Sequence, residues 1–221
     1  MSMCSYLQES SRAAYTFYVH FPTFAYERRL GREGHIVIGV DEVGCGCLAG
    51  PVIAAAVHLP VNSRIASIHD SKELSAKERS RVFLELLIQK VPFALGSASV
   101  KEINEINIRQ ASLLAMRRAI AGLPFATFAL VDAWTVPQLH IQQLAIIKGD
   151  QISKSIAAAS IVAKVVRDRL MDEYDKDFPG FGLAVHKGYA TAIHRQALRK
   201  FGPTSIHRPL FLRKLFENKS I

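Results

Sequence analysis

Apolar runs separated by short polar breaks predict alternating strands and helices along this chain of 221 residues. The runs rich in β-branched and small apolar residues predict strands at 36–40, 52–57, 93–100, 127–131 and 144–147. Apolar positions at helical spacing predict helices over 24–34, 76–90, 103–121, 152–176, 189–200 and 209–217. This order is typical of an α/β fold, in which helices flank a mixed, mostly parallel central sheet.

Acidic residues follow three of these predicted strands. Asp41 and Glu42 end the first strand, Asp132 ends the fourth, and Asp150 follows the fifth after Lys148. Strand ends are where α/β sheets form their sites, so we expect the four carboxylates to converge. Such a cluster is stable around divalent cations with hard oxygen ligands, and Mg²⁺ or Mn²⁺ is the natural choice. The competing interpretation is that the acids are simply solvated at the strand ends.

Three glycines, Gly44, Gly46 and Gly50, surround the first acidic pair. The apolar run resumes at once after them, which predicts two strands joined by a tight turn. Glycine permits positive φ and lets another backbone come close. We therefore expect a substrate backbone to approach the acids here.

The net charge of +9 is concentrated near the end of the chain. Residues 180–221 contain eight Lys or Arg and one acid, Glu217, a balance of +7. A charge run is usually a solvated face, but this asymmetry favours a phosphate-binding surface and a polyanionic partner.

Cysteine content and hydropathy indicate the cellular compartment in which we expect the protein. Three cysteines make no disulfide framework for a chain of this size, which favours a reducing cytoplasm. Cys45 and Cys47 alone form a weak metal signal. No apolar run is long enough for a membrane span, and no signal peptide is visible, so we expect no membrane association.

Several motifs along the chain resemble, in content and in order, those of a known protein family. The segment Gly39-Val40-Asp41-Glu42-Val43-Gly44-Cys45-Gly46, with Leu48-Ala49-Gly50-Pro51-Val52 after it, resembles the signature of type 2 ribonucleases H, the ribonuclease HII family. Further blocks follow in the family's order at 70–72, 131–133, 148–150, 156–164, 167–168, 186–189 and 205–208. The resemblance covers nearly everything from about residue 25 to residue 208.

The resemblance implies a ribonuclease H-like fold and an endoribonuclease. The expected reaction is hydrolysis of RNA in RNA–DNA hybrids and 5′ of single ribonucleotides embedded in DNA, leaving 3′-hydroxyl and 5′-phosphate ends. Two divalent cations would activate water and stabilise the leaving oxygen. Ribonucleotide repair and RNA primer removal are the expected roles. The matching metal-binding and catalytic acids are Asp41, Glu42, Asp132 and Asp150. The expected substrate-binding residues are Gly44, Cys45, Gly46, Lys72, Lys148, Ser160, Lys164, Lys187, Tyr189 and Arg208.

One departure from the family concerns the loop that, by resemblance, senses the ribose 2′-hydroxyl. Cys45 stands where the family carries Arg, and Cys47 where Pro is usual. One alternative is therefore a catalytically weakened protein that only binds hybrids. Another is a redox-responsive nuclease in which both thiols oxidise. A third is ribonuclease HIII, although the stretch before residue 36 is expected to be too short for that group's added N-terminal domain.

The remaining expectations concern organisation and single residues. We expect a catalytic domain at 1–178, with an N-terminal extension at 1–35, a basic helical cap at 179–221, and a monomer. The apolar tail at 210–216 is a candidate for docking on a sliding clamp, although packing on the cap is the simpler expectation. Lys164 and Arg167 are expected to reach phosphates, and Asp168 is expected to pair with a basic side chain. His186, His194 and His207 are expected to form no compact metal site, with neutral or phosphate-facing roles.

Overall fold

The structure is a computed structural model that describes residues 21–65, 68, 71 and 74–217. Its centre is one five-stranded sheet in the order β3-β2-β1-β4-β5. β1 pairs antiparallel with β2 and β2 with β3, whereas β1–β4 and β4–β5 are parallel. The sheet is therefore mixed, as predicted, but half of its pairings are antiparallel. The strands are β1 Val37–Val43, β2 Val52–Val57, β3 Phe93–Ala98, β4 Phe128–Asp132 and β5 Gln142–Ile146.

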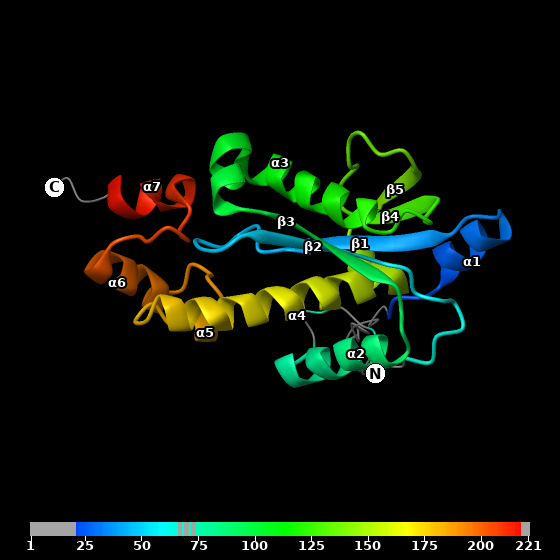
Figure 1. Cartoon of the computed structure of the whole chain (residues 1–221), viewed down its shortest axis with the longest axis horizontal. Coiled ribbons are helices and arrows are strands. Elements are labelled where there is room, and N and C mark those ends of the chain that lie inside the picture. The colour runs from blue at the N-terminus through cyan, green and yellow to red at the C-terminus, as the bar shows by residue number, and fades with distance from the viewer. Residues whose placement is uncertain (1–20, 66–67, 69–70, 72–73, 218–221) are drawn as a thin grey trace, which may run out of the picture.

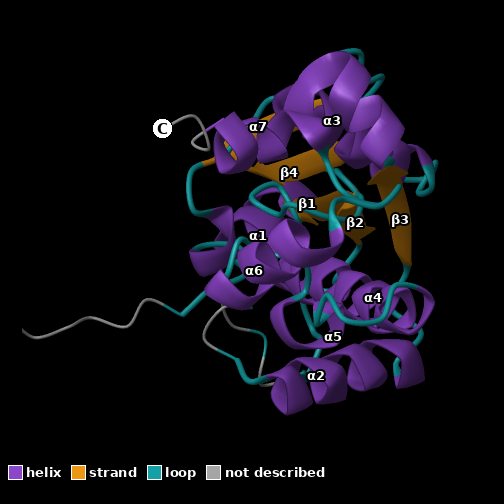
Figure 2. Ribbon diagram, turned by 90° about the vertical axis from the view of Figure 1, so that its left-hand side faces the viewer, coloured by secondary structure: helices purple, strands orange, loops and turns teal. Residues whose placement is uncertain are grey.

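Helices cover both faces of this sheet. In Figure 1, α3 lies above the sheet and α4 and α2 lie below it, while α5, α6 and α7 gather at one end and α1 at the other. Figure 2 shows the same layers from the side. The helices are α1 Ala25–Arg32, α2 Ala76–Ile88, α3 Val100–Ala121, α4 Lys154–Asp177, α5 Leu183–His186, α6 Ala192–Phe201 and α7 Pro209–Glu217, with a short 3₁₀ turn at Gly149–Gln151.

The helix starts follow from local sequence. Ser75 caps α2 and Ser99 caps α3, each in a reciprocal arrangement with a glutamate three residues later. These capping boxes satisfy backbone N–H groups that the first turn leaves without partners. The predicted start of α2 is thereby confirmed. α3 begins earlier than predicted and contains a break at Asn107, where φ is +66°.

The long helices approach the sheet closely where small residues allow it. A side chain at Gly39 would lie 2.0 Å from the backbone of Ser155 in α4. A side chain at Gly96 would lie 2.0 Å from the carbonyl oxygen of Ala115 in α3. The alanines at 157–159 are fully buried. Glycine and alanine thus bring each helix axis close to a strand, which fixes the sheet between α3 and α4.

Three sequence predictions about these elements were wrong. Asp41 and Glu42 lie within β1, which continues to Val43, because antiparallel pairing with β2 continues past them. The connection between β1 and β2 is an eight-residue loop, not a tight turn, because segments from elsewhere in the chain hold it in place. We call residues 44–51 the glycine loop. The helical spacing of apolar residues in 103–121 also predicts that Ile106 is buried, but it is 36% exposed because it lies just before the break in α3.

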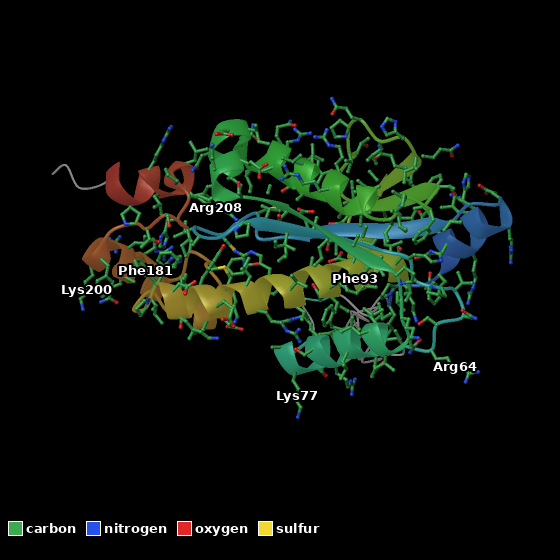
Figure 3. All side chains as sticks on the ribbon, in the orientation of Figure 1. Arg64, Lys77, Phe93, Phe181, Lys200 and Arg208 are labelled. Atoms are coloured by element: carbon green, nitrogen blue, oxygen red, sulfur yellow. The ribbon has the colours of Figure 1, made fainter. Side chains whose placement is uncertain are left out.

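The segment after residue 178 builds its own apolar cluster, which includes Phe181, Leu198 and Ile206 and packs on Leu48 and Met171. We call residues 179–217 the cap. Figure 3 shows Lys200 at its outer side, while Arg208 lies where the cap meets the sheet. The domain boundary predicted at 178 stays a prediction, and most of the N-terminal extension lies outside the described residues. Within the described ranges, no helix is both long and apolar enough to span a bilayer.

Candidate active site

The carboxylates lie where two parallel strands separate. β1 pairs with β4 only as far as Val40 opposite Val131. Beyond that point Asp41 and Glu42 continue in β1, and Asp132 ends β4. Because parallel strands present their carboxyl ends at one edge, the three side chains meet there. We call Asp41, Glu42, Asp132 and Asp150 the carboxylate edge.

A cavity of about 410 Å³ opens at this edge. Three of the four predicted acids line it. Asp150 is 2% exposed and is not among the described lining residues, but its neighbour Gly149 donates its N–H to Asp132 Oδ1 over 2.7 Å. The lining residues are Asp41, Glu42, Val43, Gly44, Cys45, Gly46, Ser71, Arg79, Asp132, Ser160, Lys164 and Tyr189.

The charged form of Asp41 is disfavoured in this cavity. Burial raises its pKa well above the usual value, and the nearby charges of Glu42 and Asp132 raise it further. A hydrogen bond from Ser160 and the N–H of Glu42, 2.7 Å from Asp41 Oδ1, lower that pKa only in part. Ser160 Oγ also lies 2.8 Å from Ser71 Oγ. The repulsion between these acids is what a bound cation would relieve.

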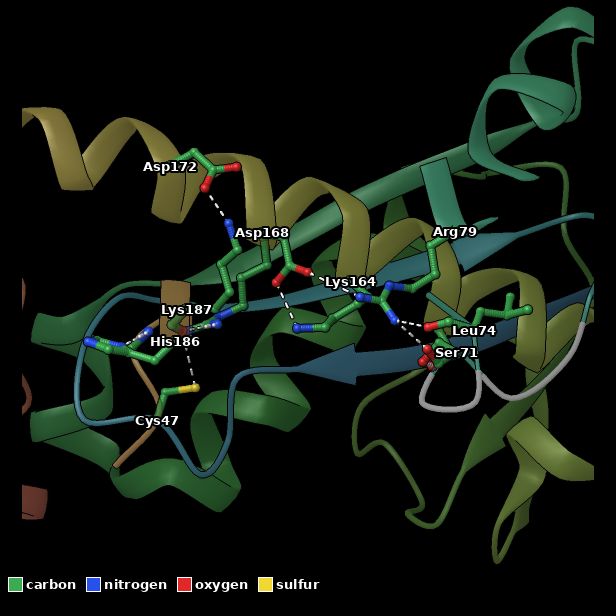
Figure 4. A network of polar contacts seen from close by, with 12 residues as sticks. Cys47, Ser71, Leu74, Arg79, Lys164, Asp168, Asp172, His186 and Lys187 are labelled. Carbon is green, nitrogen blue, oxygen red and sulfur yellow. Dashed lines mark hydrogen bonds and ion pairs between the residues drawn. The ribbon is translucent and has the colours of Figure 1, made fainter. Parts of the chain in front are cut away.

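Basic side chains from two helices line the same cavity as the acids, and Figure 4 shows their polar contacts. Lys164 of α4 donates to Asp168 Oδ1 over 2.7 Å, and its Nζ lies 5.5 Å from the centre of the Tyr189 ring. Arg79 of α2 donates to the carbonyl of Ser71 over 2.8 Å and lies 3.7 Å from Asp168. The prediction that Asp168 pairs with a basic side chain is confirmed. Lys164 keeps its expected place at the site.

The glycine loop is held between two cap segments. Leu48 N–H donates to Gly188 O, and Arg208 N–H donates to Leu48 O, each over 2.8 Å. Gly50 N–H donates to Ile206 O, also over 2.8 Å. Two isolated bridges, Cys47 with Tyr189 and Ala49 with His207, complete this arrangement. Segments more than 130 residues apart in sequence therefore position the loop beside the acids.

Two buried guanidinium groups lie beneath the loop. Arg208 donates to the carbonyls of Gly44 over 2.7 Å, Cys45 over 3.2 Å and Gly50 over 2.8 Å. Arg167 donates to the carbonyls of Ala49, Pro51 and Lys187 over 2.9–3.2 Å. Burial lowers the pKa of Arg208 to about 10, so it stays protonated at neutral pH. Loop carbonyls are the acceptors for both cations.

This burial changes the roles of both arginines. Arg167 and Arg208 have no exposed surface, so the prediction that Arg167 reaches a phosphate is wrong. Arg208 lies in the expected region, but its contacts are with loop carbonyls. It therefore acts as a positioning residue for the glycine loop. Sequence alone could not separate the two roles, because an Arg near a motif suits either one.

The other predicted substrate residues are distributed around the cavity. Tyr189 is 40% exposed and lines it, and Gly46 is exposed. Lys187 forms an ion pair with Asp172 of α4. Lys148 is exposed beside Asp150, with φ of +54°. Lys72 lies outside the described residues. The site-residue assignment as a whole stays a prediction.

The two cysteines of the loop have different surroundings. Cys45 Sγ donates to Glu42 Oε1 over 3.2 Å and lies 3.0 Å from Ser112 Oγ of α3. Burial and the charge of Glu42 raise the pKa of the Cys45 thiol to about 12. Cys47 is fully buried, and burial raises its pKa as well. Both effects disfavour the thiolate, which weakens the redox hypothesis.

The three histidines His186, His194 and His207 form a buried cluster of ring contacts and hydrogen bonds, which the sequence did not predict. His186 and His194 stack with ring centres 4.3 Å apart. His207 accepts the N–H of Thr204 at Nδ1, so its Nε2 carries the proton and donates to His194 Nε2 over 3.1 Å. His194 then donates from Nδ1 to Tyr189 O over 2.9 Å. These neutral tautomers fix the backbone of Tyr189 and leave no phosphate-facing role.

Sequence reasoning missed three residues of the site: Arg79, Ser71 and Ser112. Arg79 lies in the first turn of α2, where the N-cap at Ser75 pointed only to a helix start. Ser112 lies on the buried face of α3, 67 residues from Cys45. The only available signal was the 70–72 motif, which contains Ser71 and precedes Arg79 in the sequence.

The family model for ribonuclease HII matches residues 38–219. Curated relatives include a ribonuclease HII from Lachnoclostridium phytofermentans, 53% identical over 180 residues, covering 81% of this chain and 71% of the relative. Another, from Syntrophotalea carbinolica, is 47% identical over 188 residues, covering 84% and 90%.

Solved structures give the same fold. A chain from the PCNA:RNase HII complex of Archaeoglobus fulgidus has a TM-score of 0.69 at 26% identity, covering 81% of this chain and 96% of that one. Bst-RNase HIII in complex with Mn²⁺ has a TM-score of 0.61 at 22% identity, covering 75% and 62%, and supports the fold alone. The predicted ribonuclease H-like fold is confirmed.

Proposed function

Since the chain belongs to the ribonuclease HII family and is a ribonuclease H-type endonuclease acting on nucleic acid, we propose that it cleaves at the carboxylate edge. Its substrates are the RNA strand of RNA–DNA hybrids and duplex DNA with embedded ribonucleotides, cut on the 5′ side. The products carry 3′-hydroxyl and 5′-phosphate ends. The observation that carries this proposal is the single cavity that joins three acids, the glycine loop and Tyr189.

Enzymes of this family use divalent metals, and we propose Mg²⁺ or Mn²⁺ here. The donor set suits such ions, because carboxylate oxygens are the hard ligands they prefer and the acids repel one another without a cation. Asp41, Glu42, Asp132 and Asp150 would hold them. Among the described residues no three such side chains already form a ligand set. Bound cations would activate water and stabilise the leaving 3′ oxygen.

The chain's own side chains place the substrate. Lys164 and Arg79 line the cavity beside the acids and supply positive charge for the phosphate that is cut. The exposed ring of Tyr189 packs against the sugar, and the open backbone at Gly46 admits the strand. Ser160 orients Asp41 by its hydrogen bond. Lys148 and Lys187 extend the positive surface around this centre, and the family resemblance assigns Lys72 to substrate binding as well.

A weakened, hybrid-binding role is the second candidate. The observation that favours it is the bond from Cys45 to Glu42, which ties the residue that departs from the family pattern to one of the four acids. In this case the fold would bind hybrids and cleave them poorly.

The wider role is also part of the proposal. A monomer that removes ribonucleotides from DNA and RNA primers in a reducing cytoplasm suits the two free thiols of the glycine loop. A sliding clamp would dock on the tail at 210–216. Leu210 is 36% exposed there, whereas Leu212 packs into the cap.

The test is cleavage of a DNA duplex that contains one ribonucleotide, with Mg²⁺ or Mn²⁺. We expect a cut 5′ of the ribonucleotide by the natural chain, a loss of about 10³-fold or more in Asp41→Asn, and only a modest change in Cys45→Arg. Binding without cleavage by the natural chain, restored to cleavage by Cys45→Arg, would replace the enzyme proposal with the hybrid-binding one.

A further inference from the structure

The only tryptophan of the chain lies beside the carboxylate edge and is exposed. Trp134 is 41% exposed, although large aromatic rings are usually well buried. The Arg109 guanidinium of α3 lies 4.6 Å from the centre of its ring. A cation at this distance is attracted by the ring and has fewer orientations available. The pair is therefore a preorganised positive group next to a partly open aromatic surface.

The local backbone fixes Trp134 near the acids. Asp132 ends β4, and Ala133, with φ of +56°, turns the chain immediately after it. Ala133 N–H donates to Ile146 O over 2.9 Å, and Trp134 N–H lies 2.6 Å from Asp132 O. The indole thus starts from a backbone position only two residues beyond a proposed catalytic acid.

Arg109, the partner of Trp134 on α3, is positioned by a separate part of the backbone. The break at Asn107 lets its side chain accept the N–H of Gln110 over 3.2 Å, which starts the second part of α3. Arg109 lies in that first turn. Ser112, one turn further on, lies 3.0 Å from Cys45 of the glycine loop. The same helix face therefore contacts the loop and carries the arginine.

A second pair of a cation and an aromatic ring borders the acids from the other side. Lys164 of α4 lies 5.5 Å from the centre of the Tyr189 ring. Because α3 and α4 cover opposite faces of the sheet (Figures 1 and 2), Arg109 and Lys164 start from helices on opposite faces. Sequence reasoning found only Tyr189 and Lys164.

Simple packing does not account for Arg109. In the described part of the chain no carboxylate lies within ion-pair distance of it, and Arg109 is exposed. Its forked guanidinium matches a phosphate, and the indole beside it matches the apolar face of a sugar. A duplex seated over the acids must extend past the cavity in both directions, so its backbone can reach this pair.

We propose that Arg109 and Trp134 form a second nucleic-acid contact, in which Arg109 binds a backbone phosphate flanking the cleavage position and Trp134 packs on the adjoining sugar. This contact rests on the proposed function and extends the binding surface to the α3 side of the sheet. It contributes to affinity and leaves the chemical step to the acids.

The test is the affinity of the full chain for a duplex with one ribonucleotide, measured by fluorescence anisotropy in EDTA over a series of salt concentrations. We expect Arg109→Gln to weaken binding by roughly 5- to 10-fold and to reduce the slope of log Kd against log salt by about 1. Trp134→Ala should weaken binding by a similar factor, and the double variant should lose less than the product of both losses, because each residue supports the other.

The matched control is Arg29→Gln. Arg29 is also an exposed arginine against an aromatic ring, 5.5 Å from the centre of Tyr26, but it lies on α1 at the opposite end of the sheet. Its substitution should leave both affinity and cleavage unchanged. In Arg109→Gln, KM should rise while kcat stays within about 2-fold of the natural chain, because the acids are untouched.

The outcomes separate this inference from the proposed function. If the natural chain cleaves the duplex and Arg109→Gln binds it as tightly with an unchanged salt slope, the second contact is wrong and the active site stands. If the natural chain neither binds nor cleaves the duplex, the proposed function fails first. Equal losses in Arg109→Gln and Arg29→Gln would mean diffuse charge attraction, which also overturns the contact.

Discussion

The carboxylate edge and the glycine loop adjoin the same cavity but are built in opposite ways. The carboxylate edge places like charges side by side where β1 and β4 separate, and burial together with mutual repulsion raises the pKa of Asp41. The glycine loop carries no charge of its own, and the buried cations Arg167 and Arg208 satisfy its carbonyls. The first region is destabilising in the protein alone, which the proposed cations would relieve, whereas the second is stabilised by the protein's own side chains.

This difference indicates a division of labour. Stored repulsion at the acids favours the metal-bound state that the proposed chemistry needs. A loop fixed by many hydrogen bonds holds its shape before substrate arrives, which suits substrate placement. Substitutions in the loop supports should therefore act on stability and substrate binding, and substitutions of the acids on the chemical step.

The largest stability effect is expected at Arg208. Arg208→Lys keeps a charge but loses the fork that reaches three loop carbonyls, so we expect the free energy of unfolding to fall by roughly 2–4 kcal/mol. Urea unfolding measures this. The control is Arg195→Lys, because Arg195 is exposed and donates to one carbonyl, and its loss should stay below about 0.5 kcal/mol. Equal stability of the two variants would contradict the proposed support of the loop.

The next effect concerns pH. Burial lowers the pKa of His207 from 6.5 to about 4, so the folded protein keeps it neutral while the unfolded chain protonates it below pH 6.5. The stability contribution of the neutral ring is complete above pH 6.5 and is lost as the pH falls toward 4. The total loss is roughly 3 kcal/mol, at about 1.4 kcal/mol for each pKa unit.

Urea unfolding between pH 7 and 4.5 tests this expectation. His207→Asn should flatten the fall in stability by roughly 1 kcal/mol per pH unit relative to the natural chain. The exposed His140 supplies the control, since His140→Asn should leave the slope unchanged. Identical slopes in all three proteins would mean that His207 titrates alike in the folded and unfolded states.

The residues behind these two predictions, Arg208 and His207, also show where sequence reasoning succeeded and where it failed. The acids were found because apolar runs end in them, and the start of α2 because Ser75 and Glu78 lie close in sequence. The contacts of Arg208 and Arg167 with the glycine loop could not be predicted, because their loop acceptors lie 116 to 164 residues away and are backbone carbonyls, which carry no residue-type signal. The histidine cluster was missed for the same reason.

A smaller effect is expected at Gly46. A Cβ there would meet nothing within 4 Å, so Gly46→Ala should leave the melting temperature unchanged. The added methyl group would occupy the space through which the substrate strand approaches, and we expect KM to rise roughly 10-fold. Gly31→Ala is the matched control, because a Cβ at Gly31 also meets open space but lies on α1. An unchanged KM in Gly46→Ala would place the substrate elsewhere.

The smallest effect is expected at Cys45. Serine can form the same contacts with Glu42 and Ser112, so Cys45→Ser should change stability by less than about 1 kcal/mol. Because the thiol pKa is about 12, peroxide should inactivate the natural chain and Cys45→Ser at similar rates. Rapid inactivation of the natural chain alone would revive the redox hypothesis.

The most direct test of the division of labour is steady-state cleavage of a duplex with one ribonucleotide by the natural chain, Asp132→Asn and Gly46→Ala. We predict that Asp132→Asn lowers kcat by about 10³-fold with KM nearly unchanged, and that Gly46→Ala raises KM with kcat nearly unchanged. A natural level of kcat in Asp132→Asn would contradict the assignment of the chemistry to the carboxylate edge.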